Sequence, residues 1–176
     1  MRLTFLWSTP QKITDYREYR DGMVEPDFQA FFRAQGDLRA GLHSASSLFH
    51  MHDWVWAAHE TTIRASFRWK ETGIGPQPVT RKSQFADALA DEHPDFELVR
   101  AIANASKHLS LFAPPTNRSL PSHRPSHAAN TYVEVSYSWG VIRNERVLIE
   151  GSNRPLIDVL SSTRTWWDDL LARHRW

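Results

Sequence analysis

The 176-residue sequence contains no cysteine, and this absence excludes whole classes of scaffold and site. Without thiols the chain can form neither a disulfide-stapled domain nor a cysteine-ligated zinc or iron–sulfur site, and it has no thiol nucleophile. The sequence also lacks an apolar run of about 18 residues, the length that a membrane-spanning helix needs. The segment Met1–Thr9 is too short for a signal peptide. We therefore expect a soluble, cytoplasmic protein with no membrane partner.

An excess of one charge is missing too, because 21 basic residues are balanced by 20 acidic residues. Such a balance argues against a surface that coats nucleic acid without regard to sequence. Glycine-rich phosphate loops and the serine motifs of hydrolases are also absent. Tryptophan and histidine, in contrast, are abundant, with eight and nine residues. From these observations we predict no cofactor and no bound metal.

The length suits one domain, which we predict to extend over residues 1–176. Within it, residues 26–112 form a helical half. Residues 113–130 form a flexible, proline-rich loop. Residues 131–176 form a hairpin and a C-terminal helix.

In the helical half, apolar residues recur every three or four positions from Pro26 to about Lys70, which predicts one long helix. The pair Gly36-Asp37 predicts a break in it. The segment Thr72–Pro78 holds two glycines and two prolines, so we predict a loop there. A short helix capped by Ser83 and a longer helix that begins at His93-Pro94 follow.

After residue 131 the apolar residues alternate, and the pattern is that of strands. The segments Tyr132–Trp139 and Val147–Ile149 flank the turn-like Arg143–Glu145, which predicts a β-hairpin. Pro155 then begins a last helix. One face of this helix carries Leu156, Val159, Leu160, Thr163, Trp167, Leu170 and Leu171. The predicted fold is mainly α, of the α+β class: a long-helix pair or small helical bundle with a C-terminal antiparallel β-hairpin and a closing helix.

Three segments in this order carry a family resemblance. The first is His50–Trp56, which contains His-Asp-Trp; the second is Asp95–His108, which contains Ile-Ala-Asn and ends in Lys-His; the third is the hairpin with its tryptophan-containing helix. Together they are similar to a group of uncharacterised bacterial proteins with a "DW" helix and an "IANxxKH" helix. The second segment also resembles, more loosely, the signature of HEPN domains, in which one helix carries an Arg and a His separated by four to six residues. Here seven residues separate Arg100 from His108, and Ala101 replaces the usual polar residue.

The HEPN resemblance implies a metal-independent ribonuclease whose cleft lies between two protomers. It also implies a toxin–antitoxin or phage-defence setting, and hence three partners: RNA, a second copy of the chain in a homodimer, and a cognate protein. By this resemblance His108 would be the acid and base. Arg100 and Lys107 would hold the phosphate.

The residue chemistry of this helix is compatible with such a site. Positions i, i+4 and i+8 drift by only about 80°, so Arg100, Asn104 and His108 can share one edge, with Lys107 beside it. Cationic side chains neutralise charge that develops on a phosphate, and an imidazole transfers protons near neutral pH. Asn104 would orient the cluster, and Asp53 would support it from the neighbouring helix.

A structural interpretation of the same residues stays open. Lys107 and His108 lie near a helix C-terminus, where positive charge is favourable. Arg100 can pair with an acid such as Glu97, and Asp53 can pair with Arg100 or Lys107 across a helix seam. The alternative function is then a non-enzymatic interaction or oligomerisation protein.

Two further groups of residues bear on the choice of function. Trp54 and Trp56 lie about 200° apart on a helix, so one of them faces away from the core and could stack a base or join an interface. Trp166 and Trp167 raise the same question, and we expect core or dimer packing for these rings. A third, metal-dependent function would use His52, His59 and His108. His52 and His59 are two helical turns apart, so a third ligand would have to lie between them.

Overall fold

The computed structural model describes residues 12–71, 74–107, 131–138, 141–150 and 152–176. Within these residues the fold is mainly helical, as the sequence predicts, and it holds two small antiparallel sheets where the sequence predicts one hairpin. In chain order the elements are α1 (Tyr16–Tyr19), the π-helix η1 (Arg20–Val24), α2 (Glu25–Arg33), α3 (Leu38–Ser66), β1 (Arg68–Glu71), β2 (Ile74–Pro78), α4 (Lys82–Glu92), α5 (Pro94–Lys107), β3 (Thr131–Ser138), β4 (Val141–Ile149) and α6 (Leu156–His174). None of the helices in this described part is both long and apolar enough to cross a membrane.

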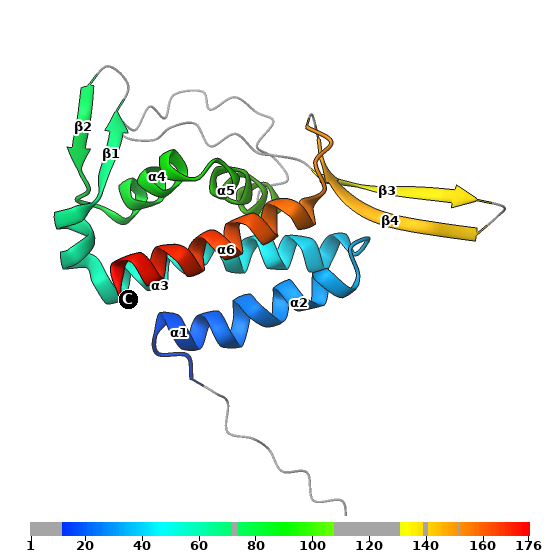
Figure 1. Ribbon diagram of the computed structural model, residues 1–176, viewed down its shortest axis with the longest axis horizontal. Coiled ribbons are helices and arrows are strands. Elements are labelled where there is room, and N and C mark those ends of the chain that lie inside the picture. The colour runs from blue at the N-terminus through cyan, green and yellow to red at the C-terminus, as the bar shows by residue number, and fades with distance from the viewer. Residues whose placement is uncertain (1–11, 72–73, 108–130, 139–140, 151) are drawn as a thin grey trace, which may run out of the picture.

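The long helix α3 is the centre of the molecule. Figure 1 shows α6 lying along it, with α4 and α5 on one side and α1 and α2 on the other. The predicted apolar face of α6 is buried at all seven positions, which confirms that helix and its orientation. Trp167 also donates its indole N–H to the carbonyl oxygen of Leu48 in α3 at 3.2 Å. This bond satisfies the polar atom of a side chain that is otherwise surrounded by apolar groups.

The predicted break between α2 and α3 is confirmed, and two residues explain it. The Asp37 carboxylate accepts a hydrogen bond from the backbone N–H of Ala40 at 3.1 Å and so caps α3. Gly36 lies against β4, because a Cβ atom built on it would be 2.3 Å from Cβ of Glu145. The backbone N–H of Val147 donates to the Gln35 carbonyl beside it. The C-terminal hairpin therefore packs against the chain at this break.

The loop predicted at Thr72–Pro78 is wrong over its described part, because Ile74–Pro78 forms β2 and pairs antiparallel with β1. β2 tolerates its prolines because each removes only one backbone N–H, and in a two-stranded sheet the outer edge of each strand makes no hydrogen bonds to another strand. The predicted cap of the next helix is also wrong. Ser83 lies inside the first turn of α4, and Arg81 occupies the cap position. The Gln84 side chain instead accepts from the backbone N–H groups of Thr80 and Arg81.

The C-terminal hairpin is confirmed as β3 and β4, and it projects from the end of the helical body opposite β1 and β2 (Figure 1). The turn predicted at Arg143–Glu145 is wrong, because these residues lie within β4, which begins at Val141. The proline-rich segment 113–130, predicted to be a flexible loop, lies outside the described residues.

Candidate functional site

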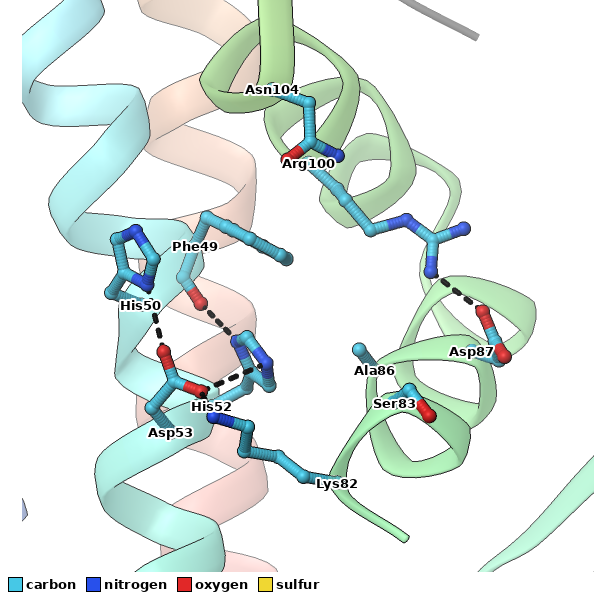
Figure 2. Close-up of a pocket in the computed structure, with 10 residues that line it drawn as sticks. All are labelled: Phe49, His50, His52, Asp53, Lys82, Ser83, Ala86, Asp87, Arg100 and Asn104. Atoms are coloured by element: carbon cyan, nitrogen blue, oxygen red, sulfur yellow. Dashed lines mark hydrogen bonds and ion pairs between the residues drawn. The ribbon is translucent and has the colours of Figure 1, made fainter. Parts of the chain in front are cut away.

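A pocket of about 310 Å³ opens between α3, α4 and α5. Figure 2 shows His50, His52 and Asp53 of α3 on one side and residues of α4 and α5 on the other. Three of the five predicted site residues line this pocket, namely Asp53, Arg100 and Asn104. Lys107 is the last residue of α5, and its side chain is not among those described; His108 follows it outside the described residues. The complete lining is Phe49, His50, His52, Asp53, Lys82, Ser83, Ala86, Asp87, Arg100 and Asn104.

Asp53 is the centre of a cluster of basic groups. Its Oδ2 lies 2.7 Å from Nδ1 of His50, and its Oδ1 lies 2.5 Å from Nζ of Lys82. The same Oδ1 is 3.4 Å from Nε2 of His52. Burial acts to raise the pKa of Asp53, but the hydrogen bond with His50 and the charges of His52 and Lys82 outweigh it and lower that pKa. Asp53 is therefore a carboxylate at neutral pH.

His52 is buried, with only 5% of its surface exposed, and its tautomer is set by the helix itself. Nδ1 lies 2.6 Å from the carbonyl oxygen of Phe49, three residues earlier in α3. Since a carbonyl oxygen only accepts hydrogen bonds, Nδ1 must carry the proton, and Nε2 of the neutral ring keeps its lone pair. Burial is the main cause that lowers the pKa of His52, against the opposing effect of Asp53. The neutral ring thus presents a proton acceptor at the pocket wall.

Arg100 connects α5 to α4 in the wall opposite His52. Only 7% of its surface is exposed, and its NH1 donates to Oδ1 of Asp87 at 2.7 Å. Its NH2 lies 2.6 Å from Oε2 of Glu97, the pairing that the sequence suggested. Burial acts to lower the pKa of Arg100, but the bond with Asp87 and the charge of Glu97 raise it. The predicted alternative pairing of Asp53 with Arg100 is wrong, because each has other partners on its own side of the pocket.

Of the histidines considered for a metal site, His52 and His59 have separate surroundings, and His108 lies outside the described residues. His59 interrupts the helical geometry of α3 and stacks on Trp176, with 4.8 Å between the ring centroids. His52 instead packs against Phe49 and Phe96. Among the residues that the structure describes, no group of three or more His, Asp or Glu side chains is placed to hold a metal ion.

The four tryptophans considered as exposed platforms are at least partly buried. Trp54 stacks on Tyr19, and Trp166 stacks on His93. Trp167 belongs to the core and the other three rings pack against it, in keeping with the core packing expected for them. The large apolar side chains that are exposed in the described residues are Phe32 and Met23, at 53% and 42%.

Sequence reasoning missed the contribution of α4, which brings Lys82 and Asp87 to the pocket. No motif marks these residues, since their role depends on how α4 packs between β1 and α5. His52 was considered only as a metal ligand. The i, i−3 relation of its ring to the Phe49 carbonyl is a helical contact that the sequence contains but does not reveal.

No protein-family model, no curated protein and no solved structure matches the chain.

Proposed function

We propose that the chain is a metal-independent ribonuclease that acts in the pocket between α3, α4 and α5. The observation that supports this proposal best is His52, a buried neutral imidazole whose Nε2 faces a pocket that also holds a lysine. Cleavage of RNA without a metal needs a base for the ribose 2′-OH and a cation for the phosphate. The pocket offers both within one cluster.

In the proposed reaction, Nε2 of His52 accepts the proton of the 2′-OH, and the 2′-oxygen attacks the adjacent phosphorus. The bond from phosphorus to the 5′-oxygen breaks, and a 2′,3′-cyclic phosphate forms. Lys82 neutralises the charge that develops on the phosphate, while Asp53 holds Lys82 beside the pocket. His108 stays our predicted donor of the proton that the leaving 5′-oxygen takes up, and Lys107 stays a predicted phosphate contact.

The other predicted residues take supporting roles in this proposal. Asn104 lines the pocket and can orient a bound ribose or phosphate through its amide. Arg100 is a positioning residue, because its guanidinium is occupied by Asp87 and Glu97 and holds α5 against α4. A toxin–antitoxin or phage-defence setting, a homodimer and a cognate protein partner remain parts of the proposal that come from the HEPN resemblance.

The test is cleavage of mixed RNA by the purified protein in excess EDTA. We expect His52→Gln to lower the cleavage rate by about 10²–10⁴-fold, the usual contribution of a general base. Lys82→Gln should also lower the rate. Because the Lys82 side chain is half exposed, the variant should fold as the parent does, and thermal unfolding of both variants checks this. The matched controls are His43→Gln, an exposed histidine on the same helix, and Arg81→Gln, the exposed cation next to Lys82. Full activity in His52→Gln would refute the proposal.

A second candidate function is a non-enzymatic interaction protein, and the state of Arg100 favours it. An arginine that is buried between two acids resembles a structural network more than a free phosphate ligand. The exposed Phe32 and Met23 would then belong to a contact surface. Absence of cleavage by the folded parent protein, with normal stability of His52→Gln, would support this function over the ribonuclease.

A further inference from the structure

We infer that a phosphodiester anion that enters the pocket takes Lys82 away from Asp53, and that this exchange makes His52 a stronger base. The inference deepens the proposed function and rests on it, since it concerns how the same pocket responds to its substrate. It assigns to Lys82 the role of a phosphate-binding residue whose resting partner is Asp53. Lys82 and His52 share one oxygen atom of Asp53.

Oδ1 of Asp53 is that shared atom, since it lies 2.5 Å from Nζ of Lys82 and 3.4 Å from Nε2 of His52. Figure 2 shows the two basic groups reaching this carboxylate from different helices, His52 from α3 and Lys82 from α4. In the resting pocket the lysine is the closer partner. The carboxylate charge is therefore largely compensated by Lys82 before it acts on the imidazole.

Lys82 is the member of the cluster that is free to move. Its side chain is 52% exposed, whereas the side chains of Asp53 and His52 are 29% and 6% exposed. Lysine has a flexible stem and a compact charge, so it can turn from one oxygen to another without disturbing the core. Lys82 is also the first residue of α4, so a phosphate bound to it would lie near a helix N-terminus, which favours anions.

Among the charged groups around His52, the contact between Lys82 and Asp53 is the one that a ligand can change. From α3 it faces His50 and Asp53, from α4 Lys82 and Asp87, and from α5 Arg100. Arg100 and Asp87 are buried and paired with each other. His50 holds the other oxygen of Asp53. Of these groups, Lys82 is therefore the one that an entering anion can most readily redirect.

The chemical consequence follows from the charge left behind. Once Lys82 contacts the ligand, Oδ1 of Asp53 has Nε2 of His52 as its near basic neighbour, and a carboxylate at this distance favours the protonated imidazole. His52 then holds a proton taken from the substrate hydroxyl more firmly. In the empty pocket the ring stays neutral and ready to accept a proton. The base is thus strengthened only when a phosphate is bound.

The test measures the pKa of His52 by ¹⁵N NMR of the imidazole, with its signal assigned from the His52→Gln variant. The probe is dimethyl phosphate, a phosphodiester whose charge does not change near neutral pH and which has no 2′-OH to cleave. Sodium chloride at equal ionic strength is the reference. We expect saturating dimethyl phosphate to raise the pKa of His52. Lys82→Gln should raise that pKa without any ligand and should weaken dimethyl phosphate binding by about tenfold or more, the usual effect of losing a charge-assisted hydrogen bond.

The matched control is Arg81→Gln, which removes an exposed positive charge next to Lys82 in the sequence and should change neither quantity. Asp53→Asn should lower the pKa of His52 and tighten dimethyl phosphate binding, because Lys82 is then released without competition. The inference is overturned if dimethyl phosphate leaves the pKa of His52 unchanged or lowers it, or if Lys82→Gln binds the probe as well as the parent does. Because the probe cannot be cleaved, a positive result without RNA cleavage would reject the ribonuclease and retain the anion exchange.

Discussion

Replacing Arg100 by methionine tests whether the ion pairs across α4 and α5 hold the pocket together. Methionine retains most of the aliphatic stem, so the main loss is the guanidinium and its contacts. Asp87, whose side chain is only 8% exposed, would lose the partner that lies 2.7 Å away. Glu97 is 36% exposed and can turn to water, so its loss of a partner should matter little.

The expected cost is that of a single uncompensated buried charge. Removing one partner of a buried ion pair typically costs about 3–5 kcal/mol. For a chain of this length, about 1 kcal/mol lowers the melting temperature by about 2–4 °C, so the variant should melt about 6–20 °C lower than the parent. Urea unfolding followed by tryptophan fluorescence measures the free energy directly, because Trp167 is buried at the α3–α6 contact.

Two companion variants separate the ion pair from general damage to the core. The double variant Arg100→Met/Asp87→Leu removes both charges, and apolar replacement of a whole buried pair is often neutral or stabilising, so most of the loss should be recovered. Arg64→Met breaks the pair of Arg64 with Glu60 on α3, where both side chains are almost half exposed, and should cost less than about 1 kcal/mol. A loss below about 1 kcal/mol in Arg100→Met, or no recovery in the double variant, would refute the structural role of Arg100.

Two further predictions concern pH and backbone packing. The pKa values of His52, His59, His93 and His174 are all lowered, with burial as the largest cause. The folded protein therefore binds fewer protons than the unfolded chain, so the free energy of unfolding should fall as the pH drops below about 6.5. The fall should be less steep in His52→Gln. A free energy of unfolding that does not change between pH 7.5 and 5.5 would contradict this prediction. Gly36→Ala should lower the free energy of unfolding by about 1–3 kcal/mol, because the added Cβ would overlap Glu145. Gly75→Ala is the control and should change the free energy little, because no atom lies within 4 Å of its added Cβ. Equal effects of the two variants in urea unfolding would show that β4 does not pack on Gly36.

The sequence by itself determined the main helices approximately and the buried face of α6 in full. The apolar spacing of α6 predicts its seven buried positions, since a helix of 3.6 residues per turn aligns those residues whatever it packs against. The break before α3 follows from Gly36 and Asp37, which are local signals for the end of one helix and the cap of the next. The alternation of Tyr132–Trp139 likewise predicts the strand that became β3. Signals of this kind act within about one turn or one hairpin of the chain.

The composition of the site was decided by the tertiary structure. Asp53 is a local feature of α3, but its partner Lys82 comes from α4, nearly thirty residues later. Arg100 was predicted to face a phosphate, yet its guanidinium also pairs with Asp87, because α4 packs against α5 and presents a buried acid. Packing of one helix on another selects among several charged residues that are equally plausible in the sequence. Ion pairs between distant segments depend on that packing, and no periodicity within either segment encodes it.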